Sequence, residues 1–330
     1  MQPIINLNNT TMKKILYYDC FAGISGDMNL GAMLDIGVCP DYLTGELKKL
    51  NLEGYEVQFS TQQRKGITGT QVNVILTGDE QRHDHGHGHG HGHGHSHSHS
   101  HVHGHHLHRH GHGSIYDGLK RRIIPEYSGE TDEEHQHGFH DGHRNLHDIE
   151  KIICKSELSD NVKAMSMDIF RLIAQAEAKI HGKPLEEVHF HEVGAIDSIV
   201  DIVGAAICFE HLAPDRIISS PVEMGGGFVN CAHGRFPVPA PATLEIMKGK
   251  PMKLGAVPFE TATPTGVAIL AAVADEFTDK PAFTILKTGY GIGQRDTEIP
   301  NVLRVCFAET SDIGHRTSNI EKKMLKKVKK

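Results

Sequence analysis

A short segment, HFHEVGAIDSIVD, concentrates side chains that bind metal ions. His189 and His191 share one face if the chain is extended there, and Glu192 lies beside them. Asp197 and Asp201 are four residues apart, so they lie on one face of the predicted helix that contains them. Imidazoles and carboxylates at this spacing suit a divalent transition metal. The alternative is structural: Asp197 stabilises the helix N-terminus, Asp201 pairs with a buried Arg or Lys, and the histidines are surface residues.

A second segment, DCFAGISGDM, joins a predicted strand to a predicted helix through a glycine-bearing turn. Asp19 at the strand end and Asp27 at the helix start are candidates to hold a cation, with Cys20 as an assisting ligand. In the simpler interpretation the segment is a tight turn, Asp27 is the helix N-cap and Cys20 is a buried core thiol. Backbone amides at such a turn can also bind a phosphate. The candidate phosphate-binding residues are Gly23, Ser25 and Gly26.

Three further segments carry residues that can contact a ligand. In GGGFVNCAHGRFPVPAPAT the glycines permit close approach and His233 lies in the flexible part, although a packed connector has the same composition. In TATPTG, Thr263 before a proline predicts a helix start, after which Thr265 and Gly266 offer a hydroxyl and an amide to an anion. GYGIG predicts a β-turn or a ligand loop, and Arg304 after it is a candidate partner for a buried acid or a phosphate.

The histidines form the strongest metal signal. Of 27 histidines, 16 lie between positions 83 and 112 in a His–Gly repeat, and five more follow by position 147. Because this tract has almost nothing apolar to bury, we expect it to be disordered without metal. It suits the capture of nickel, zinc or copper rather than catalysis, which needs a preorganised geometry. An inert low-complexity linker is the alternative.

The composition excludes several classes of protein. The net charge of −7 and the acidic body give no reason to expect nucleic-acid binding. No apolar run approaches the roughly 18 residues that cross a bilayer, and the N-terminus lacks the pattern of a secretory signal. Six scattered cysteines without a CxxC pair predict reduced thiols. We therefore expect a cytoplasmic protein without a membrane or nucleic-acid partner, and the composition leaves a homo-oligomer open.

These candidate residues need elements that position them. Hydrophobic periodicity predicts helices and strands on both sides of the His-rich tract. The predicted helices cover 28–36, 42–50, 146–154, 161–180, 195 onward, 240–248 and 264–275. The predicted strands cover 14–19, 55–63, 70–77, 216–220, 222–224, 283–288 and 302–307.

The predicted fold class is α/β, with two mixed α/β lobes separated by a disordered His-rich insertion. The predicted segments are a polar extension at 1–13, an N-terminal α/β unit at 14–78, the His-rich tract at 79–145, a second mixed lobe at 146–310 and a Lys-rich tail at 311–330.

Five motifs in this order resemble the LarC family of nickel insertion proteins: DCFAGISGDM, HFHEVGAIDSIVDIVGA, HGRFPVPAPAT, TATPTG and GYGIG followed by NVLR. The resemblance implies insertion of Ni²⁺ into pyridinium-3,5-bisthiocarboxylic acid mononucleotide, which forms the nickel-pincer cofactor of lactate racemase. It also implies a CTP-dependent cyclometallation of the lyase class, with Mg²⁺ or Mn²⁺ accompanying the nucleotide. The product has one nickel–carbon bond and two nickel–sulfur bonds.

We assign roles under this resemblance by chemistry. His191, Glu192, Asp197 and Asp201 hold or hand over nickel. Their assisting ligands are His189, Cys20 and Asp19. The catalytic candidates are Asp27, His191 and Glu192, with a carboxylate such as Asp27 taking the proton lost from the ring carbon. The cofactor-binding candidates are Gly23, Ser25, Gly26, His233, Thr265 and Gly266.

One departure from the family pattern concerns the C-terminal end. Family members continue after NVLR into a domain that begins like ETNIDDM and resembles a nucleotide-binding part, whereas here Glu309 and Thr310 fit and the following residues do not. We therefore expect the CTP site in a C-terminal domain that this sequence does not contain. Either a separate C-terminal polypeptide supplies that domain and this chain is only the N-terminal component, or the chain has lost the domain. Other expected partners are the sulfur-inserting enzyme of the pathway and lactate racemase. The alternatives are a His-rich nickel chaperone or storage protein and, less favoured, a metallohydrolase.

Overall fold

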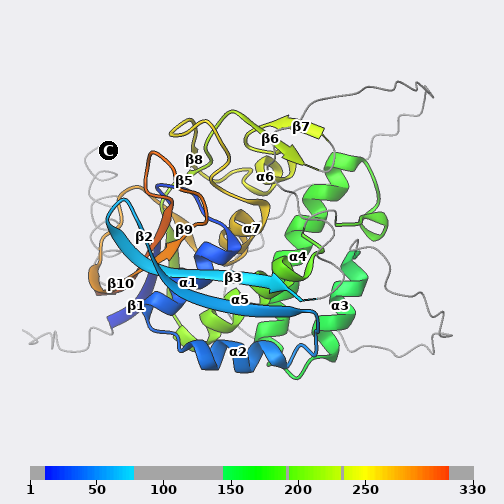
Figure 1. Ribbon diagram of the computed structural model, residues 1–330, viewed down its shortest axis with the longest axis horizontal. Coiled ribbons are helices and arrows are strands. Elements are labelled where there is room, and N and C mark those ends of the chain that lie inside the picture. The colour runs from blue at the N-terminus through cyan, green and yellow to red at the C-terminus, as the bar shows by residue number, and fades with distance from the viewer. Residues whose placement is uncertain (1–11, 78–143, 191–192, 232–233, 312–330) are drawn as a thin grey trace, which may run out of the picture.

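The computed structural model describes residues 12–77, 144–190, 193–231 and 234–311 (Figure 1). Most of the predicted polar extension, nearly all of the His-rich tract and the Lys-rich tail lie outside these ranges. His191, Glu192 and His233 also lie outside them.

A seven-stranded mixed sheet forms the centre of the fold, in the order β2-β3-β10-β11-β1-β4-β9. Interior strand β1 pairs parallel with β4 and antiparallel with β11. Strands from both sides of the His-rich tract therefore share one sheet, and the α/β class is confirmed. The boundaries of two separate lobes stay a prediction. The strands are β1 (Met12–Asp19), β2 (Tyr55–Arg64), β3 (Ile67–Leu76), β4 (Arg216–Ser219), β9 (Glu276–Phe277), β10 (Thr284–Ile292) and β11 (Val302–Ser311).

Two small sheets flank the main one. Strand β5 (Val222–Glu223) pairs with β8 (Met252–Lys253), and β6 (Phe228–Cys231) pairs with β7 (Gly234–Pro237). The β6–β7 hairpin lies in a segment that was predicted to be a loop.

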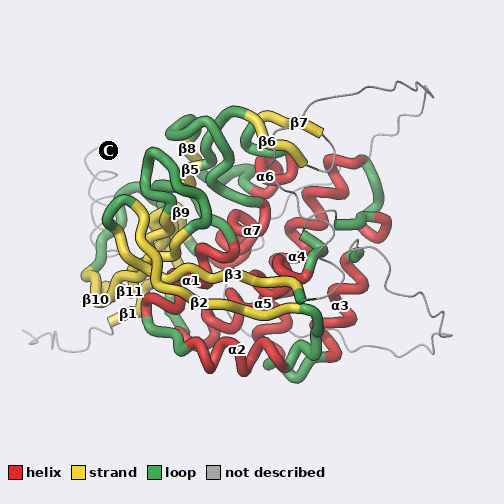
Figure 2. Tube along the Cα trace, in the orientation of Figure 1, coloured by secondary structure: helices red, strands yellow, loops and turns green. Residues whose placement is uncertain are grey.

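Helices α1 and α5 pack against the main sheet, where both contact β3 (Figure 2), and the other described helices pack mainly on helices. Helix α5 contacts four other helices, α1, α2, α4 and α7, which explains why its sequence is apolar on nearly every face. No helix in the described ranges is long and apolar enough to cross a membrane. The helices are α1 (Gly26–Ile36), α2 (Pro40–Lys48), α3 (Leu146–Lys155), α4 (Asp160–His181), α5 (Ile196–Leu212), α6 (Pro241–Ile246) and α7 (Pro264–Val273), with a 3₁₀ turn at Leu185–Glu187.

The two faces of β1 have different surroundings because successive side chains of a strand point to opposite faces. Leu16 and Tyr18 are fully buried in the main core with the helices. Ile15 and Tyr17 belong to a small second cluster on the other face. The buried Tyr18 hydroxyl donates a hydrogen bond of 2.8 Å to Asn29 Oδ1, which connects α1 to β1.

Helix α1 approaches the sheet so closely that only glycine fits at three contact points. A Cβ on Gly291 would overlap the Met28 carbonyl oxygen, and one on Gly289 would overlap that of Ala32. On the helix itself, a Cβ on Gly31 would overlap the Thr70 carbonyl oxygen. The prediction of a turn or loop at GYGIG is wrong. Most of the segment lies in β10, and two of its glycines serve close packing of a helix on a strand.

Gly291→Ala tests this packing. The added methyl group has no space against the α1 backbone, so we expect the free energy of unfolding to fall by about 1–3 kcal/mol. Urea denaturation followed by circular dichroism measures the change.

Gly45→Ala is the matched control, because Gly45 lies inside α2 and a Cβ there meets no atom within 4 Å. We expect this variant to gain about 0.5–1 kcal/mol from helix propensity. Equal stability of the Gly291→Ala variant and the wild type would contradict the close-packing account.

Candidate functional site

Three of the predicted motifs converge beside the C-terminal end of β1. The Ile24 amide donates to the Thr261 carbonyl oxygen at 3.0 Å, and the Thr263 amide donates to Ile24 at 3.0 Å. The Thr261 amide donates in turn to the Met224 carbonyl oxygen at 3.3 Å. The turn after β1, the start of α7 and the loop after β5 thus form one network of backbone hydrogen bonds.

The glycines of these motifs permit contact between the three segments. A Cβ on Gly23 would overlap the Thr261 carbonyl oxygen, and one on Gly266 would overlap that of Ile24. Both glycine amides already have acceptors, since Gly23 donates to the Cys20 carbonyl oxygen and Gly266 donates to Thr263 Oγ1. This second bond confirms Thr263 as the N-cap of α7. Phosphate binding by Gly23 and Gly266 stays a prediction, and their surroundings favour a structural role.

Asp27 lies in the first turn of α1. The N-cap is Ser25, so the alternative that Asp27 caps the helix is wrong. The Asp27 carboxylate accepts hydrogen bonds from the Ser25 hydroxyl and from the Met28 amide, the latter at 2.9 Å. Burial raises the pKa of Asp27 above its usual range, although these bonds and one from Gln294 oppose the shift. Sequence reasoning missed Gln294, because no spacing pattern links it to Asp27.

Asp201 faces the start of the same helix from α5. A Cβ on Gly26 would overlap the Asp201 carboxylate, so Gly26 is the residue that admits this side chain. Asp201 Oδ1 is buried and has no hydrogen-bond partner among the described residues. Burial raises the pKa of Asp201 well above its usual range, and the nearby charges of Asp27 and Asp197 raise it further. We call Asp27 and Asp201 the acid pair.

Among the residues that the structure describes, the other predicted ligands do not join this acid pair. Asp197 is exposed one helical turn before Asp201, and its Oδ1 accepts from the Ser198 amide at 2.7 Å. His189 is exposed, and its backbone forms a bridge with Asn145. Within the described ranges, no group of three or more His, Cys, Asp or Glu side chains is placed to hold a metal ion.

Asp19 and Cys20 have partners or surroundings that favour structural roles. Arg304 donates to Asp19 through Nε at 3.0 Å and also through Nη2, so the prediction that Arg304 pairs with an acid is confirmed. The Cys20 side chain is fully buried, and burial raises its pKa to about 12. A thiol with this pKa stays protonated at neutral pH, whereas metal binding needs the thiolate.

The chain is similar to known proteins over a range that contains these three segments. The model of the family described as nickel insertion protein matches residues 16–327. The chain belongs to the nickel insertion protein family. This result confirms the resemblance inferred from the motifs.

Members of the nickel insertion protein family are similar along most of this chain. A pyridinium-3,5-bisthiocarboxylic acid mononucleotide nickel insertion protein of Clostridium kluyveri is 52% identical over 90% of the chain and 62% of its own length. A protein with the same name from Clostridium acetobutylicum is 54% identical over 90% of the chain and 64% of its own length. A putative nickel insertion protein of Maridesulfovibrio salexigens is 57% identical over 89% of the chain and 63% of its own length. The chain thus spans less than two thirds of these relatives. No solved structure is significantly similar to it.

The acid pair predicts a pH dependence of stability. Folding raises the pKa of both carboxyl groups, so the folded chain holds their protons more tightly than the unfolded chain. Their contribution is therefore greatest below the unfolded pKa and is lost as the pH rises through the folded pKa. We expect Asp201→Asn to equal the wild type near pH 4 and to be more stable by about 1–3 kcal/mol at pH 8.

Urea unfolding in the presence of a chelator, at several pH values, measures this difference. Asp296→Asn is the control, because the Asp296 side chain is 78% exposed and should show no such divergence. A difference between the Asp201→Asn variant and the wild type that does not change with pH would contradict the account.

Proposed function

We propose that this chain takes part in inserting Ni²⁺ into pyridinium-3,5-bisthiocarboxylic acid mononucleotide. Support comes from family membership and from relatives of that name that are 52% and 54% identical to the chain. Because the chain spans less than two thirds of those relatives, the reaction of the whole protein is carried over only as this proposal. The observation that carries it is the acid pair, with its buried and unpartnered Asp201 oxygen.

The chemistry of insertion needs a proton acceptor. When nickel bonds to a ring carbon, the C–H bond of that carbon breaks and one proton is released. The two thiocarboxylate sulfurs bind nickel without further proton loss. A carboxylate with a raised pKa is a better base near neutral pH than an ordinary one. The raised pKa values in the acid pair fit this task. We assign Asp27 as the group that accepts the proton, with Asp201 as the neighbouring carboxyl group of the acid pair.

Nickel is the cargo of this reaction, so its ligands must bind it and then release it. Carboxylates and imidazoles bind nickel yet exchange it, which suits a donor site. We propose that Asp197 and Asp201, on successive turns of α5, contribute to this site together with His189, His191 and Glu192. Asp19 and Cys20 remain weaker candidates because of the ion pair to Arg304 and the protonated state of the buried thiol.

The proposed reaction is a CTP-dependent cyclometallation of the lyase class with Mg²⁺ or Mn²⁺. Mg²⁺ at a nucleotide is usually held by one or two carboxylates together with the phosphates. We assign no described residue to CTP and derive no step through it. The sulfur-inserting enzyme and lactate racemase remain proposed partners that precede and follow this step.

Asp27→Asn tests the proton acceptor. The purified chain is incubated with the mononucleotide, Ni²⁺, CTP and Mg²⁺, and the nickel-containing product is followed by mass spectrometry. Loss of the base should lower the rate about 10²–10⁴-fold. Asp41→Asn is the matched control, because Asp41 occupies the same second position of helix α2 and is exposed. We expect it to keep the wild-type rate.

A full-length relative serves as the positive control in the same assay. If the relative forms product and this chain forms none, the chain does not perform insertion by itself. If the Asp27→Asn variant is as fast as the wild type, another group takes the proton.

Deletion of residues 83–112 separates insertion from storage. The deletion removes 16 of the 27 histidines, so equilibrium dialysis should show a large loss of weakly bound nickel. We expect the insertion rate to be unchanged at saturating nickel and reduced at limiting nickel, because the tract raises only the local supply. Loss of insertion at saturating nickel would contradict this role for the tract, and loss of all nickel binding would favour a storage protein.

A further inference from the structure

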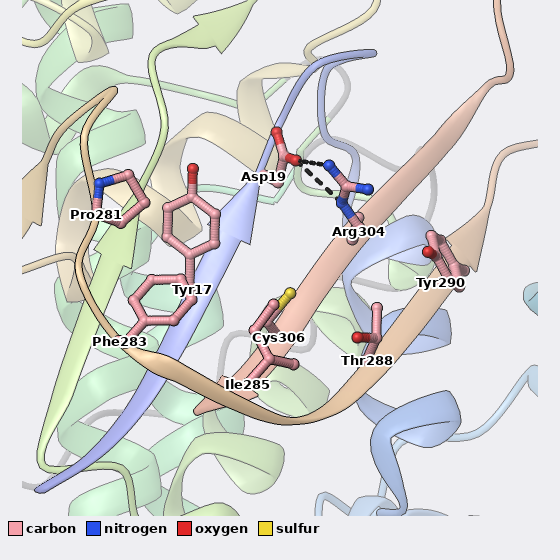
Figure 3. A pocket seen from close by; sticks show the side chains of 9 residues that line it. All are labelled: Tyr17, Asp19, Pro281, Phe283, Ile285, Thr288, Tyr290, Arg304 and Cys306. Atoms are coloured by element: carbon pink, nitrogen blue, oxygen red, sulfur yellow. Dashed lines mark hydrogen bonds and ion pairs between the residues drawn. The ribbon is translucent and has the colours of Figure 1, made fainter. Parts of the chain in front are cut away.

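A pocket of about 350 Å³ opens on the face of the main sheet that points away from α1 and α5 (Figure 3). Its side chains come from β1, β10 and β11 and from the segment that precedes β10. Tyr17 and Asp19 project from β1, opposite in register to Cys306 and Arg304 of β11. The neighbours of these β11 residues, Leu303 and Val305, lie in the core on the other face. We call this the sheet-face pocket. It is separate from the acid pair.

One end of the sheet-face pocket carries a pair of opposite charges. Arg304 donates twice to Asp19 Oδ2, and its side chain is still 43% exposed. A guanidinium has five N–H donors, so the bonds to Asp19 and a contact with Tyr290 leave donors for a further acceptor. Both of these bonds go to Asp19 Oδ2, so Asp19 Oδ1 accepts neither of them. A ligand can therefore meet a fixed positive and a fixed negative group side by side.

The other end of the pocket is aromatic. The rings of Tyr17 and Phe283 lie with their centroids 5.0 Å apart and their planes tilted by 50°. Figure 3 shows Cys306 and Thr288 between this ring pair and Tyr290. Aromatic faces attract cations through their quadrupole, most strongly when the cation is partly removed from water. The volume lies at the lower end of the range for small-molecule pockets, about 300–1,000 Å³.

The combination selects a ligand with both charges. A plain anion near Arg304 is repelled by Asp19, and a plain cation near Asp19 is repelled by Arg304. A flat zwitterion places its acid group on Arg304 and its cationic ring, which Asp19 does not repel, against the aromatic wall.

We propose that the sheet-face pocket binds a pyridinium ring that carries a carboxylate or thiocarboxylate group, with the acid group on Arg304 and the ring against Tyr17 and Phe283. The identity of the natural ligand rests on the proposed function, because the substrate named for the relatives contains this ring and these acid groups. The pocket geometry does not depend on that function. The pocket and the acid pair lie on opposite faces of the main sheet, so the pocket is assigned as a separate docking site for the substrate ring and not as the place where Asp27 takes the ring proton.

The test uses three simple probes with the full chain and without nickel or nucleotide. N-Methylpyridinium-3-carboxylate carries both charges, benzoate carries only the acid, and N-methylpyridinium carries only the cation. Binding is measured by ligand-observed NMR titration. We expect the zwitterion to bind with Kd in the millimolar range and at least about five-fold more tightly than either single-charge probe.

Variants locate the binding. Arg304→Gln should weaken zwitterion binding about ten-fold, since it removes a charge-assisted contact. Arg171→Gln is the matched control, because Arg171 also pairs with an acid, and its side chain is 45% exposed on α4. If Arg304→Gln fails to fold, as judged by circular dichroism, Tyr17→Leu removes the aromatic wall without touching the ion pair. It should weaken the zwitterion more than benzoate.

Equal binding of the three probes, no zwitterion binding, or unchanged binding in a folded Arg304→Gln or Tyr17→Leu variant would overturn the assignment. These results do not depend on nickel insertion. If the chain binds the zwitterion but gives no product in the insertion assay, the pocket assignment stands and the proposed function is rejected. If the chain gives product but does not bind the zwitterion, the proposed function stands and the pocket assignment is rejected.

Discussion

Helix α1 lies so close to β3 and β10 that only glycine fits at the contact points. The proposed site depends on this contact. Gly31 on the helix and Gly289 and Gly291 on β10 remove the side chains that would otherwise separate the two backbones. The contact fixes how closely α1 lies on the sheet, and the first turn of α1 carries Asp27. It also leaves room for α5 to pack on α1 and to bring Asp201 against Gly26.

The acid pair shows which electrostatic effect dominates at the start of α1. A helix N-terminus favours the charged form of a carboxylate by about 0.3–1 kcal/mol, and Asp27 also accepts hydrogen bonds that favour it. Burial nevertheless raises the pKa of Asp27, so it outweighs the helix dipole there, and burial together with the charges of Asp27 and Asp197 raises the pKa of Asp201. Such a site lowers the stability of the folded chain. Carboxyl groups with raised pKa values are common at functional sites.

The main sheet separates two kinds of surroundings. On the helix side, β1 places Leu16 and Tyr18 in a dry core that fixes α1. On the other side, the same strand presents Tyr17 and Asp19 to a pocket with Arg304. This division follows from the two-residue period of a strand, which lets a single stretch of sequence serve both the core and a ligand. Proton acceptance and ring binding would then be tasks of different elements joined through β1.

Local patterns predicted most of the helices and most strands of the main sheet, whereas the chemistry assigned to the site stays a prediction. The apolar periodicity of α4 and α5, the strand pair β2–β3 and the Thr263 helix start all depend on neighbours in the sequence, as does the spacing of Asp197 and Asp201. The motif order also identified the family. What the tertiary structure alone decided was which residues meet. The contact of Asp201 with Gly26 joins positions 175 residues apart, and the pair of Asp19 with Arg304 joins positions 285 apart. GYGIG has the composition of a turn, yet most of it lies in a strand, because the reason for its glycines is the backbone of α1 above them. Sequence spacing carries information about neighbours within an element, whereas burial, unpaired charge and close approach arise only when distant elements pack together.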